Sequence, residues 1–102
     1  MILVEAVYNL TDNLPKSEIY GLSSQMRRSA VSIPSNIAEG HKRGTRKDYR
    51  QFLLIALGSS AELETQLILC SRIYKDLEFK EINDLILEIQ KILSVIIKKL
   101  NS

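Results

Sequence analysis

Residues 45–74, TRKDYRQFLLIALGSSAELETQLILCSRIY, decide the fold class of this chain. Apolar and small residues recur along them at alternating spacings of four and three: Tyr49, Leu53, Ala56, Ser60, Leu63, Leu67, Cys70 and Tyr74. Such a sustained heptad seam is typical of a long helix that packs lengthwise against other helices. Thr45 and Asp48 stand three residues apart, in an arrangement like a capping box, and predict where this helix begins.

A second apolar face lies beside the seam and consists of Phe52, Ile55, Leu69 and Ile73. A helix that is apolar on two sides needs two sets of neighbours, and other chains could supply one of them. Gly58 sits in the middle of the predicted helix, where glycine costs about 1 kcal/mol relative to alanine. We therefore expect another helix to approach closely at Gly58, either within the chain or between subunits, with a local bend as the alternative.

Three further helices are predicted on either side of this stretch. Their expected bounds are residues 1–12, residues 15–41, and residues 77 or 79 to 100. The first should end before Pro15, because the residue that precedes a proline disfavours helical backbone angles. Pro15 suits the first turn of the second helix. Pro34 should kink or interrupt that helix, because proline has no backbone N–H to donate.

The four segments predict an all-α protein, a single-domain antiparallel four-helix bundle of up-and-down order over residues 1–102. The first helix is short and is already in progress at Met1. A helix of about 30 residues is roughly 45 Å long at about 1.5 Å per residue, so the molecule should be a rod.

Cysteine usage and the apolar segments indicate a cytoplasmic protein. Cys70 is the only cysteine and therefore cannot form an intramolecular disulfide, which fits a reducing compartment. The N-terminus lacks the basic segment and cleavage site of a signal peptide. The longest apolar run, Phe52 to Leu57, is too short to span a bilayer, so no membrane partner is expected.

The charge of the chain is concentrated in one region. The formal net charge is +2, yet residues 15–50 contain eight Lys or Arg against three acids. The candidate nucleic-acid-binding residues are Lys42, Arg43, Arg46, Lys47 and Arg50, together with Arg27. A local basic cluster indicates an anionic partner such as RNA or DNA, bound through its phosphates without sequence specificity. The alternative is a solubilising surface loop. Only Tyr49 lies nearby as an aromatic, so base stacking is not supported.

Four polar residues stand among apolar positions at helical spacing: Arg28, Asn36, Glu39 and Glu62. We interpret them as a structural network that fixes helix register or subunit pairing, with a binding site as the alternative. Arg28 is expected to pair with Glu39 or Glu62. Arg27 points about 100° away from its neighbour and is expected to be more exposed.

No pattern of a catalytic, metal or cofactor site is recognisable. His41 is the only histidine and stands outside any metal-ligand spacing. Cys70 lies on the heptad seam and is expected in the core. The stretch from Gly40 to Lys47 lacks the spacing of a phosphate-binding loop. We therefore predict a protein that is not an enzyme and carries neither a cofactor nor a metal.

The stretch from Tyr20 through RRSAVSIPSNIAEG at residues 27–40, together with Gly58-Ser59 and Glu62-Leu63-Glu64, resembles the 23S rRNA-intervening sequence protein family. The resemblance covers nearly the whole chain. It implies a left-handed four-helix bundle that assembles into a barrel-like homopentamer. It also implies relatedness to the accessory protein of diversity-generating retroelements, a basic pentamer that engages a reverse transcriptase and nucleic acid. The family normally has a longer first helix, which begins before the position that Met1 occupies in this sequence.

Two functions remain open from the sequence. The first is a homo-oligomer, expected to be a pentamer, whose basic rim binds RNA or DNA. The second is a protein-interaction scaffold or accessory subunit without direct nucleic-acid contact. Salt-dependent RNA binding would separate the first from the second.

Overall fold

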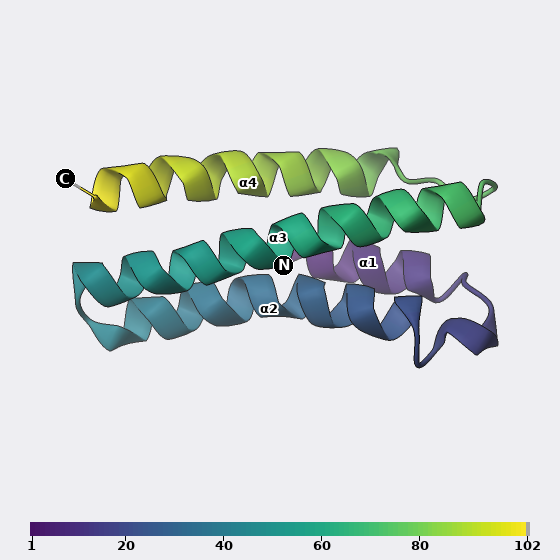
Figure 1. Ribbon diagram of the computed structural model, residues 1–102, viewed down its shortest axis with the longest axis horizontal. Helices are drawn as coiled ribbons and strands as arrows, with labels where there is room; N and C mark the ends of the chain where they lie inside the picture. Colours follow the sequence, from purple (N-terminus) through teal and green to yellow (C-terminus); the bar gives the residue numbers. More distant parts are fainter. Residues whose placement is uncertain (102) are drawn as a thin grey trace.

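The computed structural model describes residues 1–101, which form an up-and-down array of helices (Figure 1). In chain order the elements are α1 (Ile2–Thr11), the 3₁₀ turn η1 (Lys16–Glu18), α2 (Leu22–Arg43), α3 (Arg46–Ile73) and α4 (Lys80–Leu100). The molecule measures 45 × 22 × 18 Å, as expected for a rod. The predicted all-α fold with a short first helix is confirmed.

Helix α3 begins and packs as its heptad seam predicts. The Thr45 hydroxyl accepts a hydrogen bond from the Asp48 backbone N–H at 3.1 Å, which caps the first turn. Six seam residues are buried, namely Leu53, Ala56, Ser60, Leu63, Leu67 and Cys70. The two tyrosines at the ends of the seam are half-buried. The seam therefore faces the core along most of the helix, between α2 and α4 (Figure 1).

Helix α2 differs from its prediction in two ways. It begins at Leu22 rather than near Pro15, because Gly21 takes non-helical backbone angles and only one 3₁₀ turn precedes it. It also continues as one α-helix through Pro34. Ala30 and Ile33, in the turn before the proline, are fully buried. Their core contacts hold the helix together although one backbone hydrogen bond is missing.

Helices α2 and α3 are joined and packed through glycine. Gly44 ends α2 with a φ of +82°, a left-handed conformation that glycine adopts without strain. Gly40 is buried against α3, and a Cβ placed there would lie 2.7 Å from the Phe52 Cβ. A polar contact also joins the two helices, because the Ser32 hydroxyl of α2 and the Ser59 hydroxyl of α3 lie 2.8 Å apart. The two helices therefore approach closely at small side chains.

Helix α1 covers only part of the bundle. It packs on both α2 and α4, and its N-terminus lies near mid-length of the rod (Figure 1). Leu3, Val7 and Leu10 place its apolar face in the core. The half of the bundle that contains the ends of α2 and α4 thus consists of three helices, α2, α3 and α4 (Figure 1).

A tyrosine ties the far end of the rod together. The Tyr74 hydroxyl, just after α3, donates a hydrogen bond to the Glu18 carboxylate in η1. This hydrogen bond raises the pKa of Tyr74, with smaller contributions from burial and nearby negative charge. The contact links the α1–α2 connection to the α3–α4 connection.

Candidate functional site

One end of the rod gathers basic side chains from three helices. Helix α2 ends at Arg43, α3 begins at Arg46 and α4 ends at Leu100, all at the same end (Figure 1). We call this the basic end and define it by seven side chains: Lys42, Arg43, Arg46, Lys47, Arg50, Lys98 and Lys99. Five of these were predicted as nucleic-acid contacts from the sequence. The fold adds Lys98 and Lys99, which lie about 50 residues away in the chain.

Two arginines of the basic end also stabilise the fold. The Arg46 guanidinium donates from Nη2 to the Lys99 carbonyl oxygen at 3.1 Å. The Arg50 guanidinium donates from Nε to the Ile97 carbonyl oxygen at 3.4 Å. The last carbonyl groups of a helix lack partners within the helix and carry partial negative charge. Both arginines therefore cap α4, which explains why cations are tolerated in the first turns of α3.

Two lysines of the basic end lie exposed beside the α2–α3 connection. Lys42 and Lys47 are exposed, and within residues 1–101 neither side chain makes an ion pair or a hydrogen bond. Arg43 pairs with Glu39 at 3.0 Å and lies over the Phe52 ring, with 5.1 Å from the guanidinium carbon to the ring centre. The positive charge of this end is thus only partly neutralised by neighbouring acids.

Arg27 is not part of the basic end. It lies on α2 beside the C-terminal end of α1, where its Nε donates to the Thr11 hydroxyl at 2.7 Å and its Nη2 pairs with Asp12 at 2.8 Å. Its guanidinium also lies over the Tyr8 ring, 4.6 Å from the ring centre. Arg27 therefore holds the end of α1 against α2, and it lies away from the other candidate nucleic-acid-binding residues.

The predicted polar network is not brought together within one chain. The pairing expected for Arg28 is absent among the described residues, because Glu39 pairs with Arg43 one turn further along α2. Arg28 and Glu62 are exposed, whereas Arg27 is the more buried arginine, opposite to the expectation. Adjacent arginines face different neighbours, and the sequence did not show which of them faces α1.

Asn36 does belong to a small polar contact, although with other partners than predicted. Its amide donates to the Ser32 carbonyl at 2.8 Å and to the Ser32 hydroxyl at 2.9 Å, and that hydroxyl also contacts Ser59. The network therefore connects α2 to α3 through hydroxyl and amide groups. Ser32 and Ser59, which were not predicted as members of the network, contact Asn36 or each other in place of the charged residues.

The single histidine and the single cysteine have structural surroundings. His41 is exposed, and its ring meets the Tyr49 ring edge-on, with 6.0 Å between ring centres. Cys70 is fully buried, and this burial raises the pKa of its thiol, with a smaller contribution from Glu18. Within residues 1–101 no group of three or more His, Cys, Asp and Glu side chains could hold a metal ion.

Helix α3 carries more apolar surface than the core uses. By length and composition it could cross a membrane, with a mean hydropathy of 1.4 over its most apolar 18-residue window, and only 33% of that window is buried. Core helices of soluble proteins pass the same test. What distinguishes α3 is the outward apolar face predicted from the sequence, on which Ile55, Leu69 and Ile73 are exposed. Phe52, predicted for the same face, is half-buried and lies against α2 at Gly40.

Comparisons with known proteins extend over almost the whole chain. The family model described as 23S rRNA-intervening sequence protein matches residues 1–98. Among solved structures, the chain is similar to a crystal structure of a protein with unknown function from the S23 ribosomal protein family of Bacteroides thetaiotaomicron. The two chains are 31% identical with a TM-score of 0.80, over 95% of this chain and 90% of that one. The comparison with curated proteins found no match.

Proposed function

This chain belongs to the 23S rRNA-intervening sequence protein family, and on that premise we propose that it is a non-enzymatic homo-oligomer whose basic end binds the phosphate backbone of RNA or DNA. Five copies is the number that the family resemblance implies. The observation that carries the proposal is the convergence of three helix ends, which brings Lys98 and Lys99 beside the five basic residues around the α2–α3 connection.

The chemistry of the basic end favours phosphate as the ligand. Lysine and arginine side chains bind phosphate oxygens through charge-assisted hydrogen bonds. The binding would be independent of sequence, because side chains that contact only the backbone carry no information about the bases. The two aromatics on this end of α3, Tyr49 and Phe52, are both half-buried, so stacking on bases is not part of the proposal.

Assembly would strengthen this binding. Among the described residues, a single chain offers three exposed basic-end cations without an ion pair or a side-chain hydrogen bond, namely Lys42, Lys47 and Lys98. Three charges are few for binding a polyanion. A cyclic oligomer repeats the basic end around one rim. Each additional phosphate neutralised releases further counterions and increases affinity at low salt.

The test is fluorescence anisotropy of a labelled single-stranded RNA titrated with protein at two salt concentrations. Lys42→Glu combined with Lys47→Glu removes two exposed cations whose side chains make no ion pair or hydrogen bond among the described residues. Because each phosphate contact on a single strand contributes about 0.7 to the slope of log K against log salt, the double variant should lower this slope by at least about 1.4. Affinity for RNA near 50 mM salt should fall by an order of magnitude or more.

The matched control changes the net charge equally at the opposite end of the rod. Lys16→Glu combined with Lys75→Glu should leave RNA affinity within about twofold of the unmodified protein, because screening is nearly complete beyond about 10 Å. Equal losses in both double variants would mean that net charge alone matters and that the basic end is not the site. An oligomer that ignores RNA at every salt concentration would favour the protein scaffold instead.

A further inference from the structure

Two apolar surfaces of the rod are not covered by any other part of residues 1–101. The first, the outer face of α3, is defined by five residues that are 36–61% exposed: Leu54, Ile55, Ile68, Leu69 and Ile73. The second is the outer face of α4, where Leu87 and Val95 are 47% and 52% exposed. Surfaces of this kind on long helices indicate contact with another protein surface.

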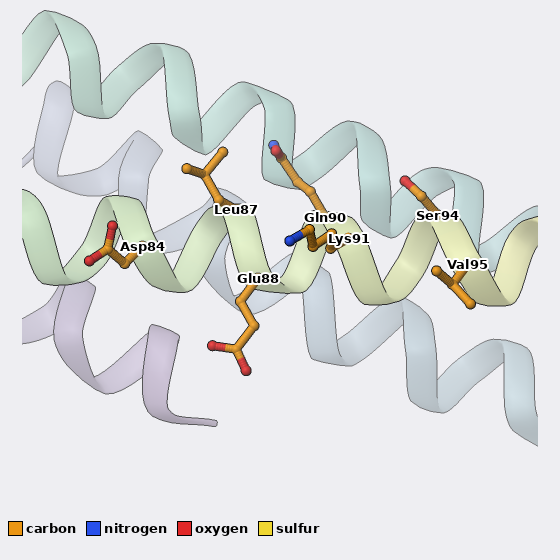
Figure 2. Close-up of a pocket in the computed structure, with 7 residues that line it drawn as sticks. All are labelled: Asp84, Leu87, Glu88, Gln90, Lys91, Ser94 and Val95. Atoms are coloured by element: carbon orange, nitrogen blue, oxygen red, sulfur yellow. The ribbon is translucent and has the colours of Figure 1, made fainter.

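The outer face of α4 is hollowed. A shallow depression of about 730 Å³ is lined by seven residues, which Figure 2 shows as sticks: Asp84, Leu87, Glu88, Gln90, Lys91, Ser94 and Val95. Leu87 and Gln90 point toward α3, and Gln90 donates a hydrogen bond to the Glu64 carboxylate of α3 at 3.1 Å (Figure 2). Glu88 points to the other side of α4 (Figure 2). The apolar residues thus form a surface with charged neighbours along α4.

Gly58 shows that the outer face of α3 is shaped for close approach. It is exposed in the middle of α3, and no atom of its own chain lies within 4 Å of the position that a Cβ would occupy. The chain itself therefore has no steric need for glycine here, although glycine is a weak helix former. A helix from outside that packs closely on α3 would need the space that glycine leaves.

Charges on the two faces select one direction of packing. On α3, Glu62 and Arg72 stand ten residues apart, and on α4, Asp84 and Lys91 stand seven apart. Within the chain Asp84 pairs with Lys80 at 2.8 Å, but this ion pair is exposed, and a second cation can join it. If α4 of another copy runs antiparallel to α3, Arg72 meets Asp84 and Glu62 meets Lys91. The spacings differ by about 4.5 Å, which long side chains span. In the parallel direction, like charges would meet.

We propose that the outer face of α3 in one copy packs antiparallel against the outer face of α4 in the next copy. The two surfaces are different, so the contact is heterologous and continues from copy to copy until a ring closes. Self-pairing of α3 would leave the outer face of α4 uncovered. Within one chain α3 and α4 are already antiparallel (Figure 1), so successive copies keep the same orientation.

This interface rests on the proposed function and deepens it. Copies in the same orientation place all their basic ends on one rim of the ring. A two-fold pairing of antiparallel bundles would place them on opposite sides. The direction of packing therefore decides whether a polyanion meets one continuous basic rim.

Cysteine cross-linking tests the interface directly, because the native Cys70 is fully buried and unreactive toward mild reagents. Ile55→Cys and Val95→Cys are made as separate variants with different tags, co-expressed and treated with a short bismaleimide. The proposal expects a cross-linked dimer that contains both tags, and no cross-link when either variant is expressed alone. A variant that carries both cysteines should give a ladder that stops at the number of copies in the ring.

A mass measurement provides the second arm. Ile55→Glu should reduce the solution mass measured by light scattering to the 11.6 kDa of one chain, with the helical circular dichroism spectrum unchanged. Ile19→Glu alters a residue of similar exposure outside the two faces and should leave the mass unchanged. Efficient cross-linking of either single-cysteine variant to itself would overturn the proposal.

These experiments distinguish a failure of the proposed interface from a failure of the proposed nucleic-acid binding. A ring that cross-links between positions 55 and 95 but does not bind RNA keeps the interface and removes the nucleic-acid role. A protein that binds RNA as a monomer keeps the nucleic-acid role and removes the interface. Uptake of the native protein by neutral phosphatidylcholine vesicles, with loss of the oligomer, would assign the face of α3 to lipid and overturn the inference.

Discussion

Gly40→Ala tests whether the close contact between α2 and α3 holds the basic end in place. An alanine Cβ would lie 2.7 Å from the Phe52 Cβ and 3.2 Å from the Tyr49 ring. The first distance is too short for any pair of Cβ atoms, so α2 and α3 must move apart. Gly40 lies in the last turn of α2, which also carries Lys42 and Arg43.

The magnitude follows from two opposing contributions. Forcing an extra methyl group into a packed interface costs about 1–3 kcal/mol. Alanine regains up to about 1 kcal/mol of helix propensity over glycine. Gly40→Ala should therefore lower the free energy of unfolding by about 1 kcal/mol, and a change of about 1 kcal/mol shifts Tm by about 4–8 °C in a domain of this size.

Gly58→Ala supplies the matched comparison, because its Cβ would meet no atom of the chain within 4 Å. That substitution should raise the free energy of unfolding by about 1 kcal/mol through helix propensity alone. Both changes are made in the Ile55→Glu background, so that contacts between copies do not contribute. Urea denaturation followed by circular dichroism should then separate the two variants by about 2 kcal/mol, with Gly40→Ala the less stable.

Equal free energies of unfolding for Gly40→Ala and Gly58→Ala would contradict a close contact between α2 and α3 at Gly40. Such a result would mean that α2 and α3 separate at no cost and that the close approach at Gly40 does not determine the position of the basic end. A loss above about 3 kcal/mol would also contradict it, because overpacking by one methyl group rarely costs more.

Three further substitutions probe the contacts around the site. Arg27→Met removes two hydrogen bonds that dock α1 and should cost about 1–2 kcal/mol in urea denaturation; no change would show that α1 is held by its apolar face alone. Arg50→Met removes the side-chain donor to the Ile97 carbonyl of α4 and should cost about 0.5–1.5 kcal/mol, with faster amide exchange there. Tyr74→Phe should lower Tm at neutral pH by removing the hydrogen bond to Glu18. Because the pKa of Tyr74 is raised in the folded chain, its stabilising effect is full below the ordinary tyrosine pKa and is lost as pH rises above it. The Tm difference should therefore shrink above about pH 10, and a constant difference would contradict the assignment.

The heptad seam of α3 predicted its helix, its N-terminal cap and its buried face, because a spacing of three and four defines one side of a helix. The pattern of the second apolar face also predicted the exposed residues Ile55, Leu69 and Ile73, but it wrongly included Phe52, which lies against α2 at Gly40. The shape of helix α2 was harder to predict. Pro34 predicted a kink or break from local chemistry, but tertiary contacts of the adjacent turn override that preference in the fold.

The basic end could be predicted only in part. Five of its residues are neighbours in sequence, whereas Lys98 and Lys99 reach it only because α4 returns antiparallel to α3. Arg46 and Arg50 were read as phosphate contacts, yet they donate to carbonyl groups of α4. No local pattern reports a contact made across about 50 residues, because it depends on how two helices align.

The half-length of α1 divides the molecule into sections of unequal local stability. Near α1, the amides of α2 and α4 lie in a four-helix section, and they open to solvent only when much of the bundle unfolds. Toward the basic end α1 no longer covers α2 and α4 (Figure 1), so less apolar contact resists local opening. Deuterium uptake should therefore rise along α4 from its N-terminal half to its C-terminal half. We therefore expect the end tied by Tyr74 to open less readily than the basic end. The polyanion proposed as ligand would then meet a surface that can adjust to it.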